Sequence, residues 1–455
     1  MTRSARRDGW LATLRRLLSR LRHALPRFPH RRRLRQIASA AARHGLGYLA
    51  GPAGLGRLAP FQRGWLGHER RDSPYTRPEH VRLALEEQGA TFVKLGQILS
   101  TRGDLLPPDY QAELARLQDA APPVPAGAVL DTVTVELGCD AGSVFATFDL
   151  QPLASASIGQ AHAATLLDGS EVVVKVRRPG VVAQVEEDLA ILARLAVRAA
   201  RRSELARRYD LPGLVAEFSS TLRAELDYLQ EGRNAERFAA NFGDDPSVHI
   251  PAVRWEATTS QVLTLERLRG VKVSDASALD AAGLDRAELA RSAATISLRM
   301  VFEHGFFHAD PHPGNFFVEP DGAIGLIDFG MVGAVDEATR QRLTALLAGF
   351  AAGDGDALVD NVLSLGVAGA SVDRARLRGD LLALATEQLN RPLGDVSFGS
   401  LLGEILVVVR RHQLVLPADL ALLIKTIAMS EGVGAQIDPS FRLAAVILPF
   451  LAGSR

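Results

Sequence analysis

The chain contains a single cysteine, Cys139, so no disulfide can form within it. One thiol fits a reducing compartment, because disulfides belong to oxidising ones. Long apolar runs are missing too: Ile405–Val409 ends at Arg410, and Leu443–Ala452 has about ten residues. A membrane-spanning helix needs about 20 apolar residues. Arginines also break the first apolar stretch, which argues against a secretory signal. We therefore predict a cytoplasmic protein with no transmembrane helix.

Lysine is scarce as well. Of the 52 basic residues, only four are lysines: Lys94, Lys175, Lys272 and Lys425. Such a bias towards arginine is typical of genome composition, which replaces lysine wherever either cation serves. The compact ammonium of lysine differs from the wide planar fork of arginine. The four lysines are therefore candidates for places where arginine fails, and two of them lie in the motifs described below.

Net charge is zero, but the charge is unevenly distributed. Residues 1–68 hold fifteen arginines and one acid, Asp8, so the remainder of the chain is acidic. Leucines recur at helical spacing between Trp10 and Leu25 with arginines among them, which predicts a basic amphipathic helix on a membrane surface. A poorly ordered arm, a helix docked on the protein's own body, and a transit peptide are alternatives. We expect residues 1–68 to bind an anionic membrane surface, which would make the protein peripheral on the inner membrane, and we expect no nucleic-acid partner.

The length of 455 residues and the hydrophobic content of 47% allow two or three domains with cores. The pattern predicts helices at 78–118 interrupted at Gly103–Pro108, a linker at 120–127, strands at Phe145–Leu153, Gln160–Leu167 and Glu171–Val176, helices over 181–240, a strand at Val262–Leu265, and mostly helix from Arg286 onwards. A β-rich part followed by a helical part predicts the α+β class.

The run His308–Asn315 (HADPHPGN) has the spacing of a kinase catalytic loop. Asp310 is followed five positions later by Asn315; in kinases the Asp contacts the acceptor hydroxyl and the Asn binds metal. Ala309 replaces the usual arginine. Two alternatives remain open. One is an ordinary polar turn, and the other is a metal-only site that uses His308 and His312, which the neighbouring prolines disfavour as a helical site.

Asp328-Phe329-Gly330 follows thirteen residues after Asn315. The run Ala323–Ile327 before it predicts a buried strand, with Asp321-Gly322 as its hairpin turn. An aspartate at the end of such a strand is well placed to hold Mg²⁺ against the phosphates of ATP. The tripeptide is a weak signal alone, but its distance from Asp310 and Asn315 makes it a strong one.

Lys175 is the single charge in the apolar strand Val172–Val176, so a buried Lys175 must have a partner. In kinases this lysine contacts the α- and β-phosphates and a helix glutamate; an outward-facing lysine is the alternative. Between the first two strands lies a loop of small residues, which lets the backbone approach phosphates, although an ordinary turn is as consistent. The loop's candidate nucleotide-binding residues are Ala154, Ser155, Ala156, Ser157, Ile158 and Gly159.

Taken together, these features resemble the UbiB/AarF family of atypical kinases over residues 75–440. The resemblance rests on Lys94–Gln97 as the Lys-x-Gly-Gln signature, the alanine-rich loop Ala154–Gln160, Glu225-Leu226-Asp227 followed by Glu231 and Asn234, and the run His308–Asn315. It implies a bilobal kinase-like fold with a basic arm at 1–74, a helical extension at 75–127, an N-lobe at 128–268 and a helical C-lobe at 269–455.

The resemblance also implies residue roles. Glu231 would be the helix partner of Lys175, with Glu186 or Glu187 as rivals. Asp227, Glu231 and Asn234 would share one helix face, since they are spaced i, i+4 and i+7. Glu266, at the end of the strand Val262–Leu265, would join the nucleotide site. Lys94 and Gln97, at i and i+3 on one helix, would belong with Glu225 and Asp227 to a family-specific lid over the active site, with Glu225 as the counter-ion of Lys94.

By this resemblance the protein would be an ATP- and Mg²⁺-dependent atypical kinase or ATPase. Its partners would be ATP, an isoprenoid lipid or quinone precursor, and quinone-biosynthesis proteins, in support of ubiquinone or other isoprenoid-lipid synthesis at a membrane surface. Two alternatives stay open. One is a conventional kinase of proteins or small molecules, and the other is a nucleotide-gated scaffold for a biosynthetic complex.

Overall fold

The computed structural model describes residues 30–44, 75–103, 105–117, 121–243, 245–352, 354–365, 372–389, 397–412, 414 and 418–453. The amphipathic helix expected between Trp10 and Leu25 lies outside these ranges. The chain forms two compact units. One is drawn from Met1–Gly96, Arg116–Gln118 and Val182–Ala216, and the other from Gln97–Ala115, Asp119–Val181 and Glu217–Arg455.

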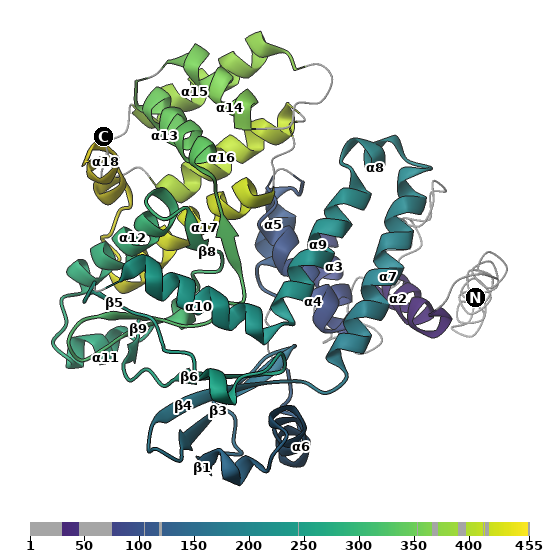
Figure 1. The fold of residues 1–455 in the computed structure, drawn as a ribbon. Coiled ribbons are helices and arrows are strands. Elements are labelled where there is room, and N and C mark those ends of the chain that lie inside the picture. Colours follow the sequence, from purple (N-terminus) through teal and green to yellow (C-terminus); the bar gives the residue numbers. More distant parts are fainter. Residues whose placement is uncertain are drawn as a thin grey trace. The chain divides into compact units, whose positions relative to one another are not determined.

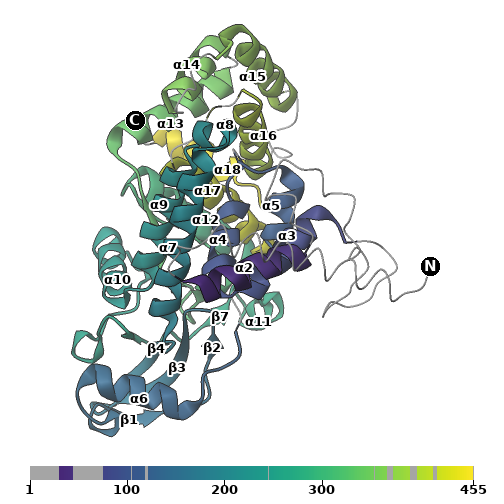
Figure 2. The ribbon, with the colours of Figure 1, turned by 90° about the vertical axis from the view of Figure 1, so that its right-hand side faces the viewer.

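The first unit is helical. Its elements are α2 (Arg31–Arg43), α3 (Arg77–Gln88), most of α4 (Ala90–Ser100), α7 (Val181–Ala200), α8 (Glu204–Arg208) and the start of α9 (Leu211–Glu225). Helix α3 begins at a capping box, in which Thr76 and Glu79 exchange side-chain and backbone hydrogen bonds of 3.4 and 2.6 Å. Helices α2 and α3 pack against each other (Figure 2).

A buried ion pair joins α2 to α7 within this unit. The Arg33 guanidinium donates to both carboxylate oxygens of Asp188, at 2.6 and 3.0 Å, and to the Gln88 carbonyl at 2.6 Å. Asp188 is fully buried, so its charge depends on this forked contact. Beside it, Glu187 pairs with His30 at 3.1 Å.

The second unit contains an antiparallel sheet in the order β1-β3-β4-β6, with β2 paired to β3. Its strands are β1 (Phe145–Phe148), β2 (Ala154–Ser155), β3 (Gly159–Leu166), β4 (Glu171–Arg177) and β6 (Val262–Glu266). Val172, Val174 and Val176 alternate along β4 and are buried in one core cluster with Val129 and Val133 of α6 (Ala126–Leu137). Strand alternation therefore puts Lys175 on the opposite face.

The sequence placed these strands well, but two boundaries were wrong. The strand expected over Phe145–Leu153 ends at Phe148, because the Asp149 carboxylate accepts from the Gln151 N–H and turns the chain. The helix expected through Asp227 is broken there: α9 ends at Glu225 and α10 (Tyr228–Phe242) starts afresh. Asp227 is the N-cap of α10, and its carboxylate accepts from the Leu229 N–H.

The rest of the second unit is mostly helical. Its helices are α5 (Pro108–Leu114), α11 (Ala276–Ala281), α12 (Arg286–Phe302), α13 (Glu337–Ala352), α14 (Gly355–Leu365), α15 (Arg374–Leu389), α16 (Phe398–Arg411), α17 (Ala418–Ile437) and α18 (Ala444–Gly453). Helices α12 and α17 pack against each other. Helix α10 lies between the sheet and this helical part (Figure 1). The α+β class expected from the sequence is confirmed.

Two small sheets flank the segment from His308 to Gly330. One sheet has the order β5 (Val248–His249), β10 (Ile324–Leu326), β9 (Phe316–Val318) and β7 (Val271–Lys272), and a second pairs β11 (Val332–Ala334) with β8 (Phe306–His308). The hairpin turn expected between β9 and β10 is present at Asp321-Gly322, with Gly322 at φ 90°. Within the described ranges, no helix is both long and apolar enough to span a membrane.

We expect Asp188→Asn to destabilise the first unit by about 3 kcal/mol, because it leaves the Arg33 cation facing a neutral group in a buried site. The matched control is Asp360→Asn, which opens the exposed pair between Asp360 and Arg374 and should cost less than about 1 kcal/mol. Urea unfolding gives the change in stability of each variant. Hydrogen exchange of α2 and α7 gives the change in protection within the first unit. Equal protection in the two variants would contradict a stabilising role of the pair.

Candidate active site

Lys175 is paired with Glu231 across the sheet–helix boundary. The Lys175 ammonium donates to Glu231 Oε1, and Glu231 lies in the first turn of α10 because Asp227 caps that helix just before it. Glu231 is buried, at 5% exposed. Of the rivals considered from the sequence, Glu187 is engaged elsewhere with His30. The helix partner of Lys175 is therefore Glu231.

The charge of Lys175 is set by its neighbours. Burial acts to lower the pKa of Lys175, but the carboxylates of Asp328 and Glu231 outweigh it, so the pKa is raised. Asp328 Oδ1 lies 3.4 Å from the Lys175 ammonium. Lys175 consequently stays protonated at neutral pH and presents a fixed positive charge.

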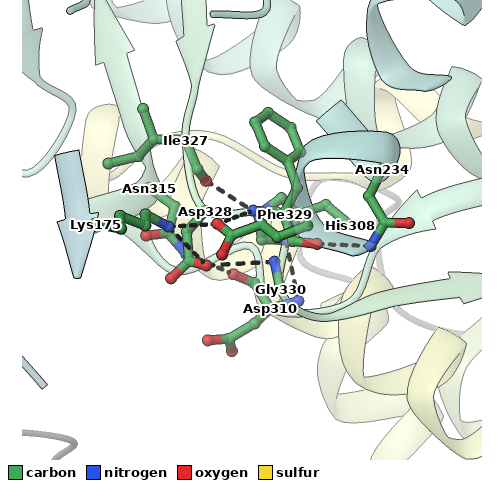
Figure 3. A network of polar contacts seen from close by, with 10 residues as sticks. Lys175, Asn234, His308, Asp310, Asn315, Ile327, Asp328, Phe329 and Gly330 are labelled. Atoms are coloured by element: carbon green, nitrogen blue, oxygen red, sulfur yellow. Dashed lines mark hydrogen bonds and ion pairs between the residues drawn. The ribbon is translucent and has the colours of Figure 1, made fainter. Parts of the chain in front are cut away.

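The Asp-Phe-Gly segment is held from α10 (Figure 3). The Phe329 N–H donates to Glu231 Oε1 at 3.2 Å, and the Asn234 amide donates to the Phe329 carbonyl at 2.9 Å. Phe329 is fully buried, with its ring centroid 5.3 Å from that of Phe238. Asp328 itself has φ 65°, in the left-handed region that few non-glycine residues adopt. Fixing Phe329 on both sides stabilises this conformation and turns the Asp328 side chain away from the core.

A neutral histidine organises the segment His308–Asn315, which has the spacing of a kinase catalytic loop. His308 Nε2 contacts the Ile327 carbonyl at 3.3 Å, and the Asp310 N–H donates to His308 Nδ1 at 3.1 Å. Burial lowers the pKa of His308, so the ring is neutral, with its proton on Nε2. Both ring nitrogens are thereby engaged, which excludes His308 from the metal-only alternative. The ring instead ties Asp310 to the residue just before Asp328.

Asn315 is oriented by the same loop. Its side-chain amide nitrogen donates to the Asp310 backbone carbonyl at 3.1 Å. Its backbone carbonyl accepts from the Ile327 N–H at 3.0 Å. The side-chain oxygen Oδ1 is the atom left to face a ligand. His312 is occupied locally, since its Nδ1 accepts from the Gly314 N–H at 3.0 Å. Asp310, Asn315 and Asp328 thus come from one continuous hydrogen-bonded segment.

The donor set fits magnesium. Asp328 supplies a carboxylate that is half exposed and Asn315 an amide oxygen. Mg²⁺ prefers oxygen ligands and is usually held by one or two protein groups, with the phosphates of a nucleotide and water completing the shell. The described residues contain no cluster of three His, Cys, Asp or Glu side chains suited to a metal. A site of this kind would therefore need phosphate oxygens to complete it.

The small-residue loop Ala154–Gly159 is anchored by Arg178, which sequence reasoning missed. The Arg178 guanidinium donates to the Ala156 carbonyl at 2.7 Å and to Ser155 Oγ at 2.8 Å, and its backbone N–H donates to the Ile158 carbonyl at 2.8 Å. The Ala156 N–H closes the turn onto the Gly159 carbonyl at 2.8 Å. These hydrogen bonds hold the loop in one conformation, unlike a flexible glycine-rich loop.

Other predicted site residues lie in several places. Glu266 ends β6, where its carboxylate accepts from the Ala252 N–H at 3.1 Å and lies 3.4 Å from His249. Glu225 ends α9, and its Cγ would lie 3.8 Å from a Cβ built on Gly330. Lys94 and Gln97 are half buried on α4, the helix on which the two units meet in sequence. Their lid role stays a prediction.

Lys425 also reaches the site, and it was missed. Its ammonium donates to Asp310 Oδ1 at 3.1 Å from helix α17, which is 115 residues further along the chain. The scarcity of lysine drew attention to Lys425, but no local motif could place it next to Asp310.

The sheet with its paired lysine, the catalytic loop and the Asp-Phe-Gly segment together define a protein-kinase-like protein. The profile of the ABC1 atypical kinase-like domain matches residues 116–362, and that of the UbiB helical domain matches residues 381–442. The chain belongs to the ABC1 atypical kinase-like family.

Several relatives are similar along most of the chain. A probable protein kinase UbiB of Azotobacter vinelandii is 38% identical over 87% of this chain and 74% of its own length. An uncharacterised protein of Synechocystis is 38% identical over 81% of this chain and 63% of its own. The solved structure of Rv3197 with erythromycin, from Mycobacterium tuberculosis, matches with a TM-score of 0.55 and 28% identity, covering 78% of this chain and 90% of that one.

A substitution at Gly159 tests the close packing at the end of the loop. A Cβ at this position would lie 2.1 Å from the Tyr228 hydroxyl and 2.9 Å from the Val176 carbonyl. We expect Gly159→Ala to lower the free energy of unfolding by about 1–3 kcal/mol through overpacking, and Tyr228→Phe in the same chain to restore part of it. A double-mutant cycle in denaturant measures this coupling.

The control is Gly127→Ala on α6, where a Cβ meets no atom within 4 Å; it should be neutral or slightly stabilising. Additive effects of Gly159→Ala and Tyr228→Phe would contradict a contact between the two residues.

Proposed function

We propose that the protein is an ATP- and Mg²⁺-dependent atypical kinase or ATPase. The observation that carries the proposal is the joint contact of the Lys175 ammonium with Glu231 and Asp328. It puts a fixed cation, a buried carboxylate and a half-exposed carboxylate at one point, as phosphate and metal binding require. Membership of an atypical kinase-like family supports it.

In the proposed mechanism, Lys175 holds the α- and β-phosphates, while Asp328 and Asn315 hold the metal. The positive charge of a Mg²⁺ ion held there would stabilise the negative charge of the phosphoryl group. The residues of the loop Ala154–Gly159 approach the phosphates with their backbone, and Asp310 orients the acceptor hydroxyl or a water. Glu231 keeps Lys175 in place, and Glu266 lines the nucleotide side.

The proposed setting is ubiquinone or other isoprenoid-lipid biosynthesis at a membrane surface. Support comes from relatives named probable protein kinase UbiB and from the basic composition of residues 1–68, which would bind an anionic surface. Lys94, Gln97, Glu225 and Asp227 would form the lid. The acceptor would be an isoprenoid lipid, a quinone precursor or water.

Mg-ATP binding tests the site directly. We expect millimolar Mg-ATP to raise the melting temperature of the wild type by several degrees, since a ligand at 100 times its Kd adds about 2.7 kcal/mol to stability. Asp328→Asn should abolish the magnesium-dependent part of this shift. Asp131→Asn on the exposed face of α6 is the control and should keep it. An unchanged melting temperature of the wild type in millimolar Mg-ATP would refute the proposed function.

Phosphate release with and without liposomes separates the alternatives. We expect release that anionic liposomes stimulate, because the reaction is proposed to occur at a membrane surface. Transfer to a soluble hydroxyl substrate without lipid stimulation would favour a conventional kinase. Binding of Mg-ATP with neither release nor transfer would favour a nucleotide-gated scaffold.

A further inference from the structure

The loop His308–Asn315 contains neither lysine nor arginine, and Ala309 stands where kinases have an arginine. His308 is neutral, because burial lowers its pKa. The carboxylate of Asp310 is nevertheless half exposed at the centre of this segment, where the acceptor and the transferred phosphoryl group would meet.

Helix α17 brings the cation from outside the loop. Lys425 Nζ donates to Asp310 Oδ1 at 3.1 Å, with 16% of the lysine side chain exposed. The hydroxyl of the next residue, Thr426, lies 3.0 Å from the Leu422 carbonyl in its own helix and 3.4 Å from the His308 carbonyl. Two successive residues of one helix therefore contact both ends of His308–Asp310. Packing of α17 against α12 and β11 fixes this placement.

We propose that Lys425 is the positioning residue for Asp310, and that the UbiB helical domain thereby supplies the charge that the catalytic loop lacks. An ammonium has three donors, and the described structure uses one of them on Asp310. The Asp310 carboxylate is held in one orientation, and a positive charge lies beside the path of the phosphoryl group, where it favours charge development in the transition state.

The amino-acid choice fits this role. Arginine outnumbers lysine by 48 to 4 in the chain, from 52 basic residues of which four are lysines. Asp310 and Lys425 make a single point contact rather than a forked one. A planar guanidinium, with donors spread over a fork, would need more room than the compact ammonium of Lys425.

The inference rests on the proposed function, so its first test does not need activity. With four lysines in the chain, reductive methylation with ¹³C-formaldehyde gives a spectrum that single lysine variants can assign. We expect Asp310→Asn to shift the Lys425 signal and to leave the signal of Lys272, on β7, unchanged. An unmoved Lys425 signal would overturn the ion pair and with it the proposal.

The second test separates positioning from folding. We expect Lys425→Met to lower kcat for phosphate release by about 10- to 100-fold, the scale of a misplaced reacting group, with the Kd for Mg-ATP and the melting temperature unchanged. Lys425→Arg should recover part of kcat, because it keeps the charge without the compact shape. Lys272→Met, which removes an exposed lysine from the same unit, should behave as wild type.

An unchanged kcat in Lys425→Met would overturn the proposal. So would losses of kcat, Mg-ATP affinity and melting temperature in parallel, since these describe a structural role only. If the wild type releases no phosphate while the ¹³C shift is observed, the proposed function and the role of Lys425 in turnover fail, but the ion pair stands.

Discussion

Much of the site depends on the contact between Lys175 and Glu231. Burying two charges costs more than their attraction returns unless the remaining hydrogen-bonding capacity is satisfied. Here it is satisfied by other working parts: Glu231 Oε1 also accepts the Phe329 N–H, and the Lys175 ammonium also contacts Asp328. The pair therefore cannot form properly unless the sheet, α10 and the Asp-Phe-Gly segment are all in place. The need to compensate two buried charges thus brings together the groups that are proposed to bind the nucleotide.

Neutral hydrogen bonds, rather than ion pairs, hold the segment around His308 in place. His308 has both ring nitrogens engaged, one on the Ile327 carbonyl and one on the Asp310 N–H. Ile327 is the residue before Asp328, so the ring connects Asp310, the proposed acceptor-orienting residue, to Asp328, the proposed metal ligand. A charged imidazole could not accept the Asp310 N–H, and burial keeps the ring neutral. Positive charge must therefore enter from elsewhere.

Local patterns predicted what depends on short stretches of sequence. The alternation of valines around Lys175, the turn at Asp321-Gly322, and the spacing between Asp310, Asn315 and Asp328 each lie within one or two elements, and the structure brings their residues together. The break at Asp227 was missed because helical spacing on both sides looked continuous, and only the capping contact with Leu229 reveals it. Arg178 was missed because most of its partners are backbone carbonyls, which carry no side-chain signature.

The contact of Lys425 with Asp310 could not be predicted from local sequence patterns. Its partner lies 115 residues away, and no periodicity spans that distance. Yet in a chain with 48 arginines and four lysines, a surviving lysine is a candidate for a site that suits a compact ammonium better than a guanidinium. Lys175 contacts two carboxylates through one nitrogen, and Lys425 contacts one carboxylate from helix α17. The exposed Lys272 does not follow this pattern. A compositional bias that seems uninformative therefore points, by its exceptions, at residues which local motifs cannot find.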